Sequence, residues 1–143
     1  MLTVSMRPGR CFMGRLPKGD DLLGALEKLC QEHNITLGEV RALGAVERAR
    51  VGFYNQKERK YYFLDFEQPL EILALVGNIS LRDGKPMVHA HVTLADAAGR
   101  AVGGHLAEGA PVFACEFVLY EYLADQKLSR QNDPATGLML WPQ

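Results

Sequence analysis

The chain has 143 residues, of which 48% are hydrophobic and 23% are charged, and its formal net charge at pH 7 is −1. This length suits a single domain, residues 1–143, whose core can fold without the help of disulfides or a metal. A charge so close to zero argues against a DNA-binding surface made of bulk positive charge, although a local basic patch is compatible with it. No apolar stretch approaches the roughly 20 residues that span a membrane.

The three cysteines predict a reducing compartment. Cys11, Cys30 and Cys115 are odd in number, far apart and set in apolar contexts, as buried free thiols are. No C-x-x-C pair is present, which argues against a cysteine zinc knuckle. Because the N-terminus also lacks the long apolar run of a signal peptide, we expect a cytoplasmic protein that does not bind membranes.

The first elements in chain order are a strand and a helix. Arg10–Leu16 has an extended pattern, and Pro17-Lys18-Gly19 ends it. Asp20 is expected to cap a helix in which leucines recur at helical spacing as far as about His33.

After the helix, the pattern is typical of strands joined by short turns. Extended segments are expected at Glu39–Val46, Arg50–Tyr54, Tyr61–Phe66, Leu70–Leu81, Val88–Ala95, Ala101–Leu106 and Val112–Leu123. Helix-length crossovers between them are absent, so the sheet should be mainly antiparallel. We therefore predict an α+β fold with about seven strands, flanked by one or two helices. The tail from Ala124 stays polar until residues 138–141, an apolar end around Trp141 that packs either on its own chain or on a neighbouring subunit.

A group of histidines is the main candidate for chemistry. His89 and His91 are two residues apart in a predicted strand, so their side chains share one face about 6.6 Å apart along the strand. Two imidazoles at this spacing can bind one metal ion. His105, on the next predicted strand, would complete a three-histidine site with an open position, the pattern of catalytic zinc.

Whether His105 reaches the other two histidines depends on the strand register. If residues 97–99 form a three-residue loop with a left-handed glycine, His91 lies directly opposite His105. A two-residue loop would shift the register by one residue and turn His105 to the other face. The same three-residue loop places Gly103 opposite Thr93, where the missing side chain would leave room for a ligand.

Two polar residues on the preceding strand are further candidates for a ligand pocket. A two-residue loop at Asp83-Gly84 would pair Asn78 with His89, whereas a four-residue loop over residues 83–86 would pair Ser80 with His89. In both registers Asn78 and Ser80 lie on the histidine face. Ordinary polarity of an exposed sheet face is the alternative explanation, and the simpler one, for both residues.

Glu116 is the candidate catalytic residue. It interrupts an apolar strand, where a carboxylate is costly unless it has a partner. Near a metal it would serve as a ligand or as a general base. A salt bridge to a neighbouring arginine is the alternative explanation.

These residues also carry a family resemblance. Leu75–Ser80, Asp83–Pro86, His89–His91 and Gly103–Leu106 resemble, in order and spacing, the plant-and-prokaryote-conserved (PPC) domain. The resemblance implies a compact α+β domain that assembles as a homotrimer. Members of the family are described as DNA-binding or regulatory, and the plant members carry AT-hook motifs. Residues 7–10 of this chain have the residue types of an AT-hook in the wrong order, so that element is missing.

The fold of the family is also similar to that of acetolactate decarboxylase, whose zinc is held by three histidines in an H-x-H…H arrangement. His89, His91 and His105 match this arrangement, which implies zinc as the cofactor. The decarboxylase activity does not follow, because a fold and a set of metal ligands do not fix the substrate.

Two functions therefore remain open, and the sequence does not decide whether the protein is an enzyme. The first is a stand-alone, bacterial-type PPC protein, a homotrimer with a metal site and a DNA or protein partner. The second is a zinc-dependent enzyme, lyase- or hydrolase-like, that acts on a small oxygen-rich metabolite with Glu116 moving a proton.

Overall fold

The computed structural model describes residues 1–142, and over this range it contains one helix and ten strands. The helix is α1 (Leu22–Glu32), and the strands are β1 (Arg7–Leu16), β2 (Gly38–Val46), β3 (Ala49–Asn55), β4 (Lys60–Phe66), β5 (Leu70–Arg82), β6 (Lys85–Ala95), β7 (Ala101–Leu106), β8 (Val112–Leu123), β9 (Ser129–Asp133) and β10 (Leu138–Leu140). The sheet order is β1-β8-β2-β5-β6-β7-β3-β4, with antiparallel neighbours throughout. The predicted antiparallel α+β class is confirmed, with more strands than the seven expected.

The additional strands come mainly from the tail, for which the sequence pattern predicts no regular structure. β9 and β10 form a small hairpin, and β9 also pairs in parallel with β5, where Leu81 lies opposite Ser129. β9 is polar and β10 is only three residues long, so neither shows a hydrophobic alternation. Pairing of β9 with β5, and of β10 with β9, holds them. Trp141 packs on its own chain, because its indole Nε1 donates a hydrogen bond of 3.0 Å to Ser80 Oγ.

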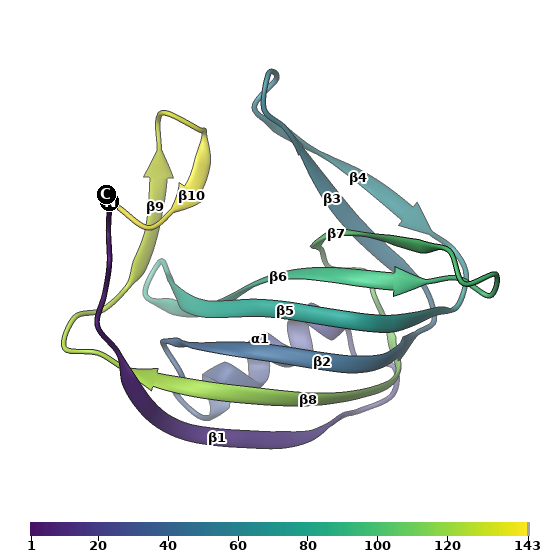
Figure 1. Cartoon of the computed structure of the whole chain (residues 1–143), viewed down its shortest axis with the longest axis horizontal. Coiled ribbons are helices and arrows are strands. Elements are labelled where there is room, and N and C mark those ends of the chain that lie inside the picture. The colour runs from purple at the N-terminus through teal and green to yellow at the C-terminus, as the bar shows by residue number, and fades with distance from the viewer. Residues whose placement is uncertain (143) are drawn as a thin grey trace.

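Helix α1 covers one face of the sheet (Figure 1). Leu22, Leu26 and Cys30 form its buried side. The cap residue is Asp21 and not the expected Asp20: its carboxylate accepts the Gly24 amide at 3.0 Å. The same carboxylate accepts the amides of residues 109 and 110, so the start of the helix is fixed by a distant turn that local sequence does not reveal. Among residues 1–142, no helix has the length and apolarity needed to cross a membrane.

The core lies between α1 and the sheet. Alternate residues of the central strands, among them Val40, Ile79 and Leu119, are fully buried there. The opposite face of the sheet has no helix over it, and it carries large apolar side chains that remain exposed. These exposed apolar residues include Met13, Leu43, Leu73, Val76 and Phe113. One face of the sheet therefore builds the core, and the other stays open.

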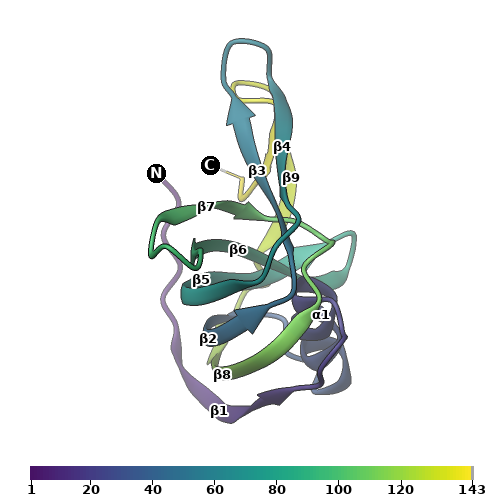
Figure 2. The same cartoon turned by 90° about the vertical axis from the view of Figure 1, so that its right-hand side faces the viewer.

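Two hairpins project from the body of the sheet on the side of β6 and β7, the strands that carry the candidate histidines. One is β3–β4 and the other is β9–β10 (Figures 1 and 2). They touch near their tips: Tyr54 Oη donates to the Thr136 carbonyl at 2.7 Å, and Arg59 Nη1 donates to the Pro134 carbonyl at 3.2 Å. The chain therefore builds a frame around one end of β6 and β7.

Replacement of Leu119 by alanine tests the core. Leu119 is 0% exposed, so Leu119→Ala should lower the free energy of unfolding by about 2–5 kcal/mol through lost burial and a residual cavity. Leu64→Ala on the exposed side of β4 is the matched control and should change it by about 0.5 kcal/mol or less. Urea unfolding measures both values, and equal losses would contradict this description of the core.

Candidate metal centre

The β6–β7 hairpin has the register that the three-residue loop predicts. The Asp96 amide donates to the Arg100 carbonyl, and the Gly99 amide donates to the Asp96 carbonyl. Gly99 has a φ of 74°, in the left-handed region that favours glycine. His91 then pairs directly with His105, as expected. The Asp96 carboxylate accepts the amides of residues 98 and 100, which stabilises this loop over a shorter one.

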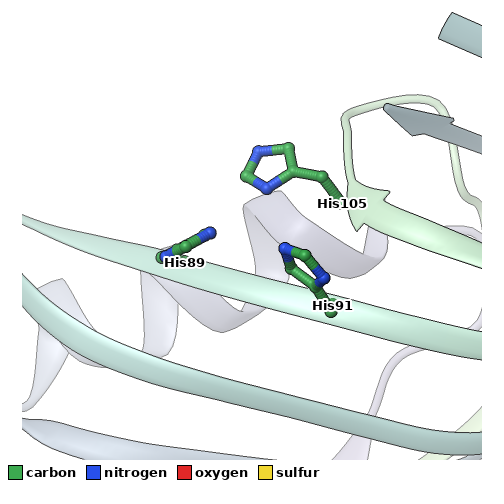
Figure 3. Close-up of side chains that lie close together, drawn as sticks. All are labelled: His89, His91 and His105. Carbon is green, nitrogen blue, oxygen red and sulfur yellow. The ribbon is translucent and has the colours of Figure 1, made fainter. Parts of the chain in front are cut away.

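This register brings the three histidines together on the face away from α1. One nitrogen from each of His89, His91 and His105 can be chosen so that all three lie within 4.8 Å of one another. The ring centroids are 5.1–5.6 Å apart, and each ring turns a nitrogen toward a common centre (Figure 3). Nitrogens on one tetrahedral zinc are about 3.3 Å apart for bonds of about 2.05 Å, so modest side-chain rotations would close the site.

His105 supplies an independent sign that the cluster suits a metal ion. Its Nδ1 is buried and has no hydrogen-bond partner within residues 1–142. An unsatisfied buried polar atom costs about 1–3 kcal/mol, and native structures contain few of them. A metal ion in the cluster would provide a partner for an imidazole nitrogen, so the residues present fit such an ion.

The protonation state of the histidines also suits a metal ion. Burial lowers the pKa of His89 to about 4, and Arg130, His105 and His91 add to the effect. Burial lowers the pKa of His105 as well, with His91 and Arg130 contributing. Both rings are therefore neutral near pH 7, and the neutral imidazole is the form that binds a metal.

Arg130 is a further candidate residue of this site, and the sequence patterns do not indicate it. It lies on β9, and its side chain reaches β5 and β6 as a buried guanidinium. Nη2 donates to Asn78 Oδ1 at 2.8 Å and lies 3.3 Å from His89 Nδ1, while Nε donates to Ser80 Oγ at 3.2 Å. The guanidinium also stacks against the Trp141 ring. The sequence does not indicate this contact, because 41 residues separate Arg130 from His89 and only the folded chain brings them together.

The structure pairs Asn78 with His89, as the two-residue loop predicts. Asp83 and Gly84 have φ values of 52° and 76°, which suit the left-handed turn that such loops adopt. Asn78 and Ser80 share the histidine face as expected, but both hydrogen-bond to Arg130. They therefore connect the histidines with the tail.

Gly103 lies opposite Thr93, as expected, and the reason for a glycine there is now visible. A Cβ on Gly103 would lie 2.2 Å from the carbonyl oxygen of Val92. The close approach of β6 and β7 therefore excludes a side chain at this position, whether or not a ligand lies nearby.

Glu116 does not come near the histidines of its own chain. It is exposed on β8 beside Arg15 and Leu43, and β8 lies three strands from β6 in the sheet order. At about 4.8 Å per strand, this separation is about 14 Å across the sheet. Glu116 instead lines a groove on the open apolar face, together with residues such as Met13 and Val118. The sequence pattern predicts the strand that carries Glu116 but not the place of that strand in the sheet order.

The low pKa of His89 predicts how the metal-free protein responds to acid. In the unfolded chain this ring takes up a proton near pH 6.5, whereas in the folded protein it does so near pH 4. The unfolded state therefore binds more protons between these values, and stability falls as the pH drops from 6.5 toward 4. Urea unfolding should show a loss of about 1–2 kcal/mol from this ring, once its exposed part is allowed for.

His89→Ala should make that decline shallower. His33→Ala, which alters the C-terminal cap of α1 away from the cluster, should leave the slope as it is in the wild type. Parallel slopes in the wild type and His89→Ala would contradict the assignment of the decline to His89.

Comparison with known proteins finds a family match over most of the chain. The model of the Plants and Prokaryotes Conserved (PCC) domain matches residues 4–123. The bifunctional protein GlmU of Synechococcus sp. (strain JA-3-3Ab) is 39% identical over 132 residues. This alignment covers 91% of this chain and 20% of GlmU, so the chain spans about a fifth of that relative's length. The likeness concerns one segment of GlmU and not its activities.

Solved structures share the fold over nearly the whole chain. A plant- and prokaryote-conserved (PPC) protein from Pyrococcus horikoshii has a TM-score of 0.94 at 32% identity, covering 100% of this chain and 98% of its own. A metal-containing protein from Archaeoglobus fulgidus has a TM-score of 0.94 at 38% identity, covering 100% of both chains. A provisionally named DNA-binding protein from Bacteroides thetaiotaomicron has a TM-score of 0.85 at 26% identity, covering 96% of both.

Proposed function

We propose that this chain, which belongs to the Plants and Prokaryotes Conserved (PCC) domain family, is a homotrimeric protein that binds one zinc ion per chain through His89, His91 and His105. The family is the one that the sequence motifs resemble, whereas the link with acetolactate decarboxylase stays a prediction. The observation that carries the proposal is the convergence of three imidazole nitrogens within 4.8 Å. The metal-containing relative from Archaeoglobus fulgidus supports it.

Zinc is proposed over other ions on the basis of the ligand set. Three neutral nitrogens without a carboxylate or thiolate suit zinc, and oxygen-preferring ions such as magnesium and calcium are disfavoured. Three protein ligands leave one position open, as in catalytic zinc sites, whereas structural sites use four. Bound zinc supplies a Lewis acid that polarises an oxygen atom of a substrate.

We favour small-molecule chemistry over DNA binding as the role of this site. The net charge is −1, whereas DNA-binding domains carry a pronounced basic patch. The histidines lie inside a frame made by two hairpins, an arrangement that suits a small oxygen-rich metabolite. A lyase or hydrolase acting in the cytoplasm, where the three free cysteines would stay reduced, is the enzyme class proposed. Binding of DNA, suggested by the name of the Bacteroides thetaiotaomicron relative, is the second candidate.

Metal analysis tests the proposed site directly. Protein purified without a histidine tag should contain about one zinc per chain, and the double variant His89→Ala/His91→Ala should contain almost none. His33→Ala is the matched control, because it removes the one histidine outside the cluster. Elemental analysis after incubation with zinc and gel filtration gives the ratio. A wild type that stays metal-free under these conditions would overturn the zinc proposal.

The open face of the sheet supports assembly. Leu43 and Val76 are each 60% exposed, and Met13 is 81% exposed. Apolar side chains gathered on one face are typical of protein interfaces. Three copies around a closed axis would cover such a face, and the family resemblance implies that number. Glu116 lies on the same face, so we propose that it meets a histidine centre only across the interface between two copies.

A charge on this face should break the assembly. We expect the wild type to have about three times the mass of the 15.9 kDa chain in light scattering coupled to gel filtration. Val76→Glu should shift it toward the monomer, because a carboxylate buried in an apolar interface loses its hydration. Lys28→Glu, on the exposed side of α1, should stay trimeric. A wild-type monomer at micromolar concentration would refute the trimer.

A further inference from the structure

Arg130 presents an electrostatic problem that its role as a structural link does not solve. The residue is 7% exposed, and none of the ion pairs within residues 1–142 includes it. Its acceptors are Ser80 Oγ, Asn78 Oδ1, the Met139 carbonyl and His89 Nδ1. All four are neutral. A buried cation without a counter-charge is costly, so an unpaired guanidinium here calls for an anion.

The contact with His89 shows when that anion is needed. A guanidinium is a donor only, so the 3.3 Å contact from Arg130 Nη2 requires a free lone pair on His89 Nδ1. The proton of the neutral ring then lies on Nε2. A metal bound at Nε2 would force the proton onto Nδ1, and a metal bound at Nδ1 would take up the lone pair. In either case Arg130 loses this acceptor when the site is loaded.

Loading of the site therefore adds positive charge beside Arg130 and leaves one of its N–H groups without an acceptor. A second N–H group is also available, because Nη1 carries two hydrogens and has one acceptor, the Met139 carbonyl. Two free N–H groups on a planar fork match the two oxygens of a carboxylate. A carboxylate would supply both the missing acceptor and the missing negative charge.

We infer that Arg130 is an anion anchor, and that the metal-loaded site takes a small carboxylate-bearing ligand whose charged end accepts hydrogen bonds from the guanidinium. This inference rests on the proposed metal site and names the ligand class of that site. A cavity of about 260 Å³ lies next to this site: it is lined by Trp141, Tyr122 and Asn78, among others, and Asn78 accepts a hydrogen bond from Arg130. Its one carboxylate, Glu39, lies 3.4 Å from a guanidinium nitrogen of Arg41.

The test compares two probes that differ in charge and little else. Lactate carries a carboxylate, and lactamide replaces it with a neutral amide of nearly the same shape. Isothermal titration of zinc-loaded wild type should show that lactate binds about 10- to 100-fold more tightly than lactamide, the range expected for hydrogen bonds between charged groups. Inorganic phosphate, which shares the oxyanion chemistry, should bind more weakly than lactate. Tighter binding of phosphate would overturn the carboxylate assignment.

Arg130→Gln should abolish the preference for lactate while leaving about one zinc per chain and the affinity for lactamide as in the wild type. Arg50→Gln is the matched control: this arginine is half-exposed on β3 beside Asp65, and its loss should leave the preference intact. Metal-free wild type should show a smaller preference for lactate than the zinc-loaded protein, because His89 Nδ1 still accepts a hydrogen bond from Arg130.

A purely structural role for Arg130 predicts different results. In that case Arg130→Gln would lower the melting temperature and keep the wild-type preference for lactate, which would overturn the inference. If this variant does not fold, Arg130→Lys provides the test. The lysine ammonium keeps the positive charge but lacks the planar fork, so the preference for lactate should be reduced but present. An unchanged preference would overturn the inference. A zinc-free wild type would overturn both the metal site and the anchor, whereas bound zinc without a preference for lactate would overturn the anchor alone.

Discussion

The candidate site depends on one constraint, the register between β6 and β7. Because side chains alternate along a strand, a slip of one residue would take His105 from the open face into the core. The three-residue loop closed by Asp96 and Gly99 fixes that register. The buried face reinforces it, since Val92 and Leu94 on β6 and Leu106 on β7 must all point toward the core together. The same pattern that packs the core therefore gathers the three imidazoles.

A second constraint comes from the tail. β9 touches the main sheet through a short parallel contact with the end of β5, and a few long side chains hold it in place. Arg130 links it to Asn78 and Ser80, and Trp141 meets the same hydroxyl of Ser80 from β10's side. These residues bury His89 and add a positive charge beside it, which are two of the causes of its low pKa. Residues of the tail thus help to lower the pKa of a histidine that lies on another strand.

The sequence predicted what short-range rules determine, and it failed where distant segments meet. The β6–β7 register, and with it the pair His91–His105, follows from loop length and glycine position. For the β5–β6 hairpin the sequence left two loop lengths open, and the structure has the shorter loop, which pairs Asn78 with His89. The helix cap is Asp21 and not the predicted Asp20, because Asp21 also binds a turn some 88 residues away. Strand β9, which carries Arg130, has no hydrophobic alternation and forms against β5, and β10 forms against β9. The position of Glu116 required the strand order, which alternation along a strand does not contain.

The proposed interface and the proposed metal site lie on the same face of the sheet. His91 is exposed, and its cross-strand neighbour on β5 is Val76, a residue 60% exposed on the apolar face. A second copy seated on Val76 would also exclude water from the open side of His91. Electrostatic interactions strengthen as water leaves, so the attraction between a carboxylate and the Arg130 guanidinium would grow in the assembled protein. An isolated subunit would then offer the same ligands in a wetter and weaker site, so the trimer would contribute to ligand binding as well as to stability.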